Sequence, residues 1–141
     1  MSFDYYIPTK ILFGAGKLDQ LAEEPLPGTK ALIVISNGTA MRKFGYLNRL
    51  IALLKAQHVD SVVYDKILPN PIKEHVMEGA AVAKENQCDF VIGLGGGSSI
   101  DAAKSIAIMA RNPGDYWDYV NGGTGKGQPV ENGALPIVAI T

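Results

Sequence analysis

Apolar runs alternate along this chain with segments whose apolar residues recur every three or four positions. The runs lie at residues 31–35, 61–64, 90–92 and 135–141. The run at 31–35 lacks in-and-out alternation, which predicts a strand buried on both faces, and we expect the same of 135–141. Helical spacing occurs at residues 18–22, 47–54, 76–83 and 100–107. Strands alternating with helices predict an α/β domain, in which helices flank a parallel sheet.

The two ends of the chain add to this plan. Residues 5–13 read as two short extended pieces broken at Pro8, which predicts an extended or hairpin segment at the amino terminus. Residues 121–129 are rich in glycine and polar residues and predict a flexible loop. The chain stops at the carboxyl end of its last strand, where the useful loops of such sheets begin. We therefore expect residues 1–141 to form one domain cut from a longer protein.

Composition narrows the classes of function. A length of 141 residues suits one domain, and a net charge of −1 without a basic stripe argues against a nucleic-acid partner. No apolar run approaches the roughly 20 residues of a membrane span, and the first residues do not resemble a signal peptide. A single cysteine, Cys88, excludes an internal disulfide framework and fits a cytoplasmic protein.

The sequence GLGGGSSIDAAKS, residues 93–105, joins a predicted strand to a predicted helix. Glycines there allow close approach to the backbone, and the helix start adds N–H donors and partial positive charge, which together suit a phosphate. Ser98 can cap the helix or donate to a phosphate, and Asp101 completes a Ser-x-x-Asp pattern that resembles a capping box. The spacing matches neither G-x-G-x-x-G nor a P-loop. Phosphate binding and a merely tight strand–helix turn both remain open.

The turn at residues 36–39 follows the first buried strand and carries no acid. In dinucleotide folds an acid at such a strand end commonly holds the ribose 2′-hydroxyl. Small neutral residues, with Arg42 and Lys43 a turn later, would tolerate a 2′-phosphate and so favour NADP over NAD. The alternative is a helix capped by Ser36 or Asn37 beside a solvated basic pair.

No catalytic or metal-binding constellation emerges from the remaining residues. His58 and His75 lie far apart, have no partner at a ligand spacing, and are expected at the surface. Cys88 precedes a buried strand and suits a small core position. Trp117 and the tyrosines beside it are expected to pack a helix, because the surrounding charge is acidic. No nucleophile–base pair indicates acyl transfer.

Three segments together resemble the amino-terminal domain of the iron-containing (group III) alcohol dehydrogenases. They are PTKILFGAG at residues 8–16, LPNP at 68–71 and GGGSSIDAAK at 95–104, the last of which matches the family's Gly-Gly-Gly-Ser-x-x-Asp-x-x-Lys pattern in full. Residues 36–45 are similar to the butanol-dehydrogenase-like branch. The resemblance covers essentially the whole chain and implies a Rossmann-like fold that binds NAD or NADP.

The resemblance also implies a set of cofactor-binding residues. Gly95, Gly96, Gly97 and Ser98 would hold the pyrophosphate, and Asn37, Gly38 and Thr39 would lie at the adenosine ribose. Asn70 would lie near the cofactor, Asp101 at the nicotinamide side, and Thr141 where a threonine-rich cofactor loop begins. Catalysis in this family uses iron, or sometimes zinc, held by a second, helical domain. We therefore expect no catalytic or metal-binding residue in residues 1–141, and no turnover by this chain alone.

The expected parent enzyme interconverts a short-chain primary alcohol or diol with its aldehyde and forms a homodimer through the extended amino-terminal segment. Two alternatives stay open. One is a non-catalytic nucleotide-binding or structural fragment. The other is a relative with different chemistry on the same architecture, such as glycerol dehydrogenase, maleylacetate reductase or dehydroquinate synthase.

Overall fold

Four parallel strands form the centre of the molecule in a computed structural model that describes residues 1–141. The strands are β1 (Lys30–Ser36), β2 (Asp60–Ile67), β3 (Phe90–Leu94) and β4 (Ile137–Ile140), in the order β2-β1-β3-β4. The predicted α/β domain with a parallel sheet is confirmed.

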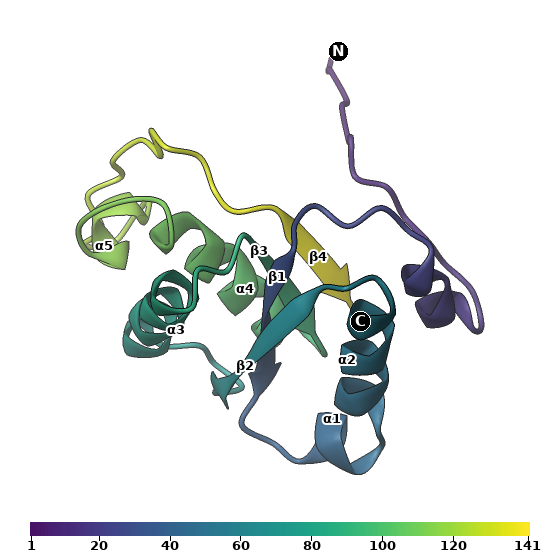
Figure 1. Ribbon diagram of the computed structural model, residues 1–141. Helices are drawn as coiled ribbons and strands as arrows, with labels where there is room; N and C mark the ends of the chain where they lie inside the picture. The colour runs from purple at the N-terminus through teal and green to yellow at the C-terminus, as the bar shows by residue number, and fades with distance from the viewer.

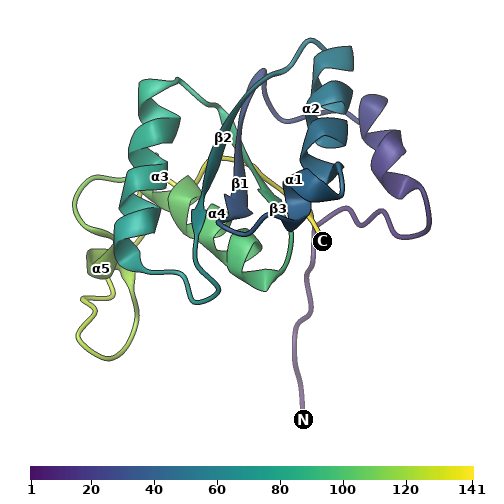
Figure 2. The same ribbon diagram turned by 90° about the horizontal axis from the view of Figure 1, so that it is seen from below.

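Helices cover both faces of the sheet (Figures 1 and 2). On one face lie the 3-10 helix η1 (Lys17–Ala22), the short α1 (Ala40–Lys43) and α2 (Tyr46–Ala56). On the other lie α3 (Lys73–Glu85), α4 (Gly97–Met109) and the short α5 (Tyr116–Tyr119). None of these helices combines the length and the apolar character that crossing a bilayer requires.

The alternating side chains of the central strands divide the core into two layers. Leu32 and Val34 of β1 face α3 and α4, whereas Ile33 and Ile35 face η1 and α2. All residues from 31 to 35 are fully buried. This burial on both faces is why the segment reads as one continuous apolar run rather than as an alternating strand.

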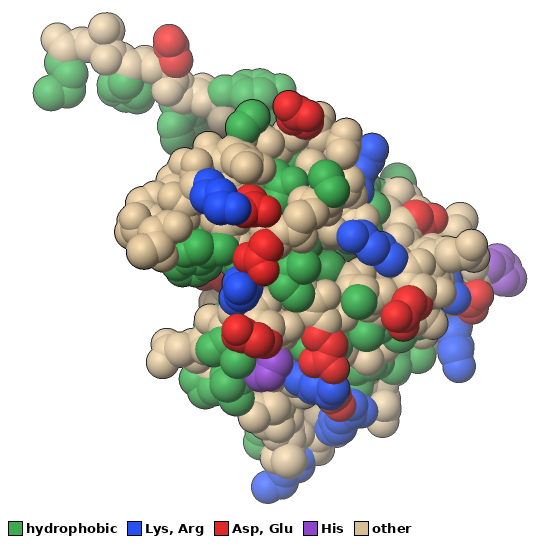
Figure 3. Space-filling model, turned by 90° about the vertical axis from the view of Figure 1, so that its left-hand side faces the viewer, with side chains coloured by type: hydrophobic (Ala, Val, Ile, Leu, Met, Phe, Trp, Pro, Cys, Tyr) green, Lys and Arg blue, Asp and Glu red, His purple; other side chains and the backbone are tan.

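The terminal segments depart from the prediction in part. Of the two forms predicted for the amino terminus, residues 1–13 take the extended one without a hairpin, and they leave the body as an exposed arm (Figure 1). Figure 3 shows this arm standing away from the charged face over α3 and α5, with apolar side chains along it. β4 is half exposed rather than buried, because it is an edge strand that pairs only with β3.

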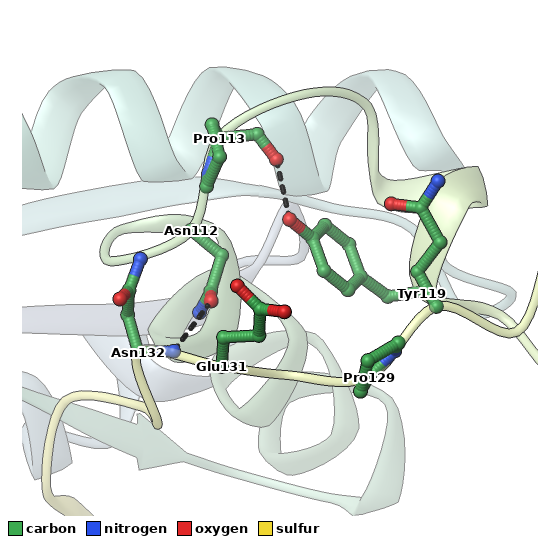
Figure 4. A pocket seen from close by; sticks show the side chains of 7 residues that line it. Asn112, Pro113, Tyr119, Pro129, Glu131 and Asn132 are labelled. Atoms are coloured by element: carbon green, nitrogen blue, oxygen red, sulfur yellow. Dashed lines mark hydrogen bonds between the residues drawn. The ribbon is translucent and has the colours of Figure 1, made fainter.

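The connection from α4 to β4 is fastened by the buried side chain of Asn112. Its amide nitrogen donates to the carbonyls of Ile108 (2.8 Å) and Gly133 (2.7 Å), and its oxygen accepts the N–H of Asn132 (3.1 Å). Asn112 and Tyr119 line a polar hollow of about 270 Å³. Figure 4 shows Asn112, Asn132 and Pro113 on one side of it and Tyr119 on the other, with the Tyr119 hydroxyl donating to the carbonyl of Pro113. The long loop is therefore an ordered part of the domain.

Candidate nucleotide site

The carboxyl ends of β1 and β3 mark the point where the direction of the sheet changes. From β1 the chain moves outward to β2, and from β3 it moves outward to β4 on the opposite side. In open α/β sheets a crevice forms at such a switch point and receives the ligand. The two turns singled out in the sequence, residues 36–39 and 95–98, both lie here.

The glycine turn begins later than the apolar run suggests, because Gly93 and Leu94 still belong to β3. Gly95 has φ +124°, a conformation that side chains rarely adopt, and its N–H donates to the carbonyl of Ile140 (2.9 Å). Gly96 is the N-cap residue of α4, and Gly97 begins the helix. A Cβ added at Gly96 or Gly97 would meet no atom within 4 Å. The backbone of the helix start is therefore open to a ligand.

The helix start offers unused donors at this open position. The N–H groups of Ser99 and Ile100 both donate to the carbonyl of Gly96, so the intrahelical bonds begin there. The N–H groups before them belong to the set that an α-helix leaves without internal partners. No side chain caps the helix, and its first turn holds no acid. Partial positive charge at this end thus favours an anion.

Ser98 and Asp101 do not form the capping pattern that the sequence suggests. Ser98 lies inside the helix, and its hydroxyl donates to the carbonyl of Pro69. The carboxylate of Asp101 instead accepts from Lys104 (3.1 Å), with both side chains exposed. The prediction of a Ser98 cap was wrong because its partner lies 29 residues earlier, beyond the reach of a local pattern.

The bond from Ser98 fastens the Pro-Asn-Pro loop to the glycine turn. It brings Pro69, and with it the exposed Asn70, beside the start of α4. Thr141 follows Ile140, whose carbonyl accepts the N–H of Gly95, so the end of the chain also lies at this turn. Asp101 lies one turn into α4, on an exposed part of the helix.

The second turn is anchored to β2. The N–H of Asn37 donates to the carbonyl of Ile67 (2.8 Å), and Gly38 and Thr39 follow on the exposed surface. Thr39 is the N-cap residue of α1 and makes no capping bond through its side chain. Caps by Ser36 or Asn37 are therefore wrong, since the helix begins later. The turn carries no carboxylate of its own.

The two turns approach each other through two side chains that sequence reasoning missed. A Cβ on Gly95 would stand 3.4 Å from the hydroxyl oxygen of Ser99 and 3.9 Å from the sulfur of Met41. Ser99 is buried beneath the glycine turn, and Met41 belongs to α1. Neither residue type signals binding by itself, because each acts here only as a small or flexible packing group under the backbone.

A hollow of about 260 Å³ lies next to the site, between the start of α3, α4 and α5. Ile72, Val76 and Trp117 give it an apolar wall. Lys73 at its polar rim forms an ion pair with Asp115 (3.1 Å). The hydrogen bond from the Trp117 N–H, and after it this ion pair, hold the pKa of Asp115 below its usual range.

Residues that could hold a metal do not gather in this chain. No group of three or more histidine, cysteine or carboxylate side chains forms a potential metal site. His58 is exposed, as expected, but His75 is half-buried and its Nδ1 is enclosed without a partner. Cys88 is buried, as expected, and burial raises the pKa of its thiol.

Comparison with known proteins decides the family. The family model described as iron-containing alcohol dehydrogenase matches residues 8–141 of the chain. The chain belongs to the iron-containing alcohol dehydrogenase family. The resemblance drawn from the glycine motif is thus confirmed over nearly the whole sequence.

Two of the curated relatives that the chain matches are an alcohol dehydrogenase and a diol dehydrogenase. NADH-dependent butanol dehydrogenase A of Clostridium acetobutylicum is 37% identical over 120 residues, which are 85% of this chain and 31% of that protein. 1,3-Propanediol dehydrogenase of Klebsiella pneumoniae is 33% identical over 140 residues, which are 98% of this chain and 35% of that protein. The chain spans about a third of the length of the curated relatives it matches.

Solved structures of the iron-containing alcohol dehydrogenase family share the fold. An archaeal halo-thermophilic alcohol dehydrogenase from a Red Sea brine pool superposes with a TM-score of 0.89 at 38% identity, covering 99% of this chain and 36% of that one. NADH-dependent butanol dehydrogenase A of Thermotoga maritima gives a TM-score of 0.86 at 32% identity, covering 98% and 34%.

Proposed function

We propose that this chain is the NAD(P)-binding domain, residues 1–141, of an oxidoreductase. The enzyme would transfer a hydride between a nicotinamide cofactor and a short-chain primary alcohol or diol, or its aldehyde. The observation that carries the proposal is the uncapped, side-chain-free start of α4 at the switch point of the sheet. The names of the relatives, which are butanol and propanediol dehydrogenases, support the substrate class.

The geometry of the two turns fits a dinucleotide. We assign the pyrophosphate to the backbone of Gly95, Gly96 and Gly97 and the adenosine ribose to Asn37, Gly38 and Thr39. Ser98 would contribute from the start of α4 and Asn70 from the Pro-Asn-Pro loop that Ser98 holds beside it, and Asp101 and Thr141 would lie toward the nicotinamide. A bound cofactor supplies the hydride chemistry. The residues of this chain bind it, orient it and expose one end of it to a substrate.

A metal does not fit the residues of this chain, since no ligand cluster forms among them. Iron or zinc would therefore have to be held by other residues of the parent enzyme. We expect these 141 residues to bind nucleotide without turning over alcohol.

The turn after β1 favours NADP over NAD. It offers no carboxylate to a ribose 2′-hydroxyl, and Arg42 lies one turn beyond it. Two relatives are NADH-dependent butanol dehydrogenases, and the NADH dependence is a property of those proteins. The proposed preference for NADP over NAD thus rests on the residues of this chain alone. We also propose a cytoplasmic location and a homodimer.

Calorimetric titration of the chain with NADPH and NADH tests the proposal. We expect binding of both nucleotides, tighter for NADPH. Gly96→Val should abolish it, because the valine side chain fills the space through which a phosphate reaches the helix start. Gly96 has φ −71° and ψ −177°, which valine readily adopts, so the variant should fold.

Ala52→Val is the matched control, because it adds similar bulk to an exposed position of α2. This variant should bind as the unaltered chain does. Failure of the unaltered chain to bind either nucleotide at millimolar concentration would refute the proposal. Binding that survives Gly96→Val would favour a merely tight strand–helix turn.

A second candidate function is nucleotide binding without catalysis. The lack of a metal ligand cluster in the chain favours it. Addition of iron or zinc to the nucleotide-loaded chain tests what the two functions share: neither predicts reduction of butyraldehyde by NADPH, and such reduction would contradict both.

A further inference from the structure

A bulge at the end of β2 places a carboxylate beside the turn after β1. Val34 pairs with Tyr64, but Ser36 pairs with Ile67, so Asp65 and Lys66 together oppose one residue of β1. Bulges of this kind re-aim side chains near sites. Lys66 pairs with Glu78 of α3, whereas Asp65 reaches α1 on the other face of the sheet. Strand β2 thus places the carboxylate of Asp65 beside the turn at residues 36–39, which has no carboxylate of its own.

Asp65 engages the arginine that follows the turn. Nη2 of Arg42 lies 2.5 Å from Oδ2 of Asp65, and this is the one hydrogen bond between them. Guanidinium carries five N–H donors in a planar fork, so most donors of Arg42 stay free. Both side chains are about half exposed, at 51% and 46%. An ion pair in such a position has little net stability and exchanges readily with a competing anion.

The pair lies directly beside the proposed ribose position. The backbone N–H of Arg42 donates to the carbonyl of Thr39 (3.1 Å), which fixes the start of its helix to the turn. On the other side, the N–H of Asn37 donates to the carbonyl of Ile67, two residues beyond Asp65. The turn is therefore flanked by the arginine on one side and the carboxylate on the other.

We propose that Asp65 competes with a phosphate monoester for Arg42 and thereby limits how strongly the turn prefers NADPH to NADH. This inference rests on the proposed nucleotide site and adds a specificity-determining residue to it. A ribose 2′-phosphate carries close to two negative charges and matches the arginine fork in a bidentate manner. A carboxylate already bound to that fork withdraws one donor and repels the phosphate.

The same carboxylate has little effect on NADH. The 2′-hydroxyl of its ribose carries no charge, so Asp65 does not repel it, and the asparagine of Asp65→Asn keeps an oxygen that can accept a hydrogen bond from that hydroxyl. Removal of the Asp65 charge should therefore change the ratio of the two affinities rather than both affinities together.

Calorimetric or fluorescence titration of four proteins tests the inference: the unaltered chain, Asp65→Asn, Arg42→Ala and the double variant. Asp65→Asn should strengthen NADPH binding about threefold to tenfold and leave NADH binding unchanged. Arg42→Ala should weaken NADPH binding about tenfold. In the double variant the gain from Asp65→Asn should vanish, since Asp65 acts through Arg42.

Asp19→Asn is the matched control. Asp19 forms an exposed ion pair with Arg49 of α2, and its loss changes the net charge equally at another place. An equal gain in NADPH affinity for Asp19→Asn, or an equal gain for NADH in Asp65→Asn, would overturn the inference. Unchanged NADPH binding in Asp65→Asn would overturn the role of Asp65 but not the proposed nucleotide site. Failure of the unaltered chain to bind either nucleotide would overturn both.

Discussion

Gly93 lies inside β3 at the place where α4 packs on the sheet. A Cβ there would stand 3.0 Å from the Cα of Ile100 and 3.1 Å from the Cβ of Ala103. Both are tighter than ordinary contacts, and the first involves backbone that cannot rotate away. The first glycine of the motif thus serves close helix–strand packing rather than the ligand.

Gly93→Ala should therefore destabilise the fold by about 1–3 kcal/mol, since overpacking forces the helix outward. Gly97→Ala, four residues later, should stabilise it by about 0.5–1 kcal/mol, because alanine suits a helix and meets no atom there. Urea denaturation measures both. Equal effects of the two substitutions would contradict the view that Gly93 serves packing whereas Gly97 lies at an open helix start.

Residue chemistry also shows where local patterns fail. The pattern Ser98-x-x-Asp101 predicts a cap, yet the hydroxyl of Ser98 is taken by Pro69 and Asp101 by Lys104. The partner of Arg42 is similarly remote, since Asp65 lies on another strand. Sequence spacing finds the glycines because backbone conformation is local, but it cannot see hydrogen bonds across the fold.

At the scale of elements, Asp89 joins the starts of β1 and β3. Its carboxylate accepts the N–H of Thr29 (2.8 Å), the hydroxyl of Thr29 (3.0 Å) and the N–H of Lys30 (2.9 Å). Burial alone would raise the pKa of Asp89, but these hydrogen bonds outweigh it and lower the pKa. The charged form is thus favoured in the folded chain.

Asp89→Asn should lower the free energy of unfolding at neutral pH by about 1–3 kcal/mol. Because the pKa of Asp89 lies below its ordinary value of 3.8, the charged carboxylate stabilises the fold above pH 3.8, and this stability is lost as the pH falls through the lowered pKa. The difference in the free energy of unfolding between the unaltered chain and Asp89→Asn should therefore narrow below pH 3.8. Denaturation from pH 6 to pH 3 measures it, with Asp4→Asn in the exposed arm as control. A gap that widens on acidification would contradict the assignment.

Strands that are buried on both faces can be predicted well from the sequence. Residues 31–35 and 90–92 are strands with two covered faces, and they were predicted from apolar continuity alone. The run at 135–141 is also largely apolar, yet its strand, Ile137–Ile140, lies at the edge of the sheet and is half exposed. Composition gives the tendency to form a strand, but its place in the sheet depends on what else packs there.

At the scale of the whole molecule, the arm of residues 1–7 contributes exposed apolar surface. Its large side chains are exposed, Phe3 by 82% and Tyr6 by 87%. The first ion pair that ties the segment to the body is that of Lys10 with Glu24. Exposed apolar segments and open strand edges favour association between molecules.

Deletion of residues 1–7 should leave the free energy of unfolding unchanged within about 0.5 kcal/mol. It should at the same time reduce concentration-dependent self-association, because the apolar arm is gone. Thermal denaturation and sedimentation velocity measure the two effects. A deleted chain that unfolds several degrees earlier would show that the arm packs on the body in solution.

The buried amide of Asn112 has a consequence for the order in which the domain assembles. The entropy lost when a loop closes grows with its length, so β4 would pair only slowly with β3 through a long free connection. Asn112 bonds to Asn132 and Gly133 and leaves only a few residues before β4 begins at Ile137. One side chain thus divides a distant strand pairing into two shorter closures, and we expect β4 to join the sheet after the hydrogen bonds of Asn112 have formed.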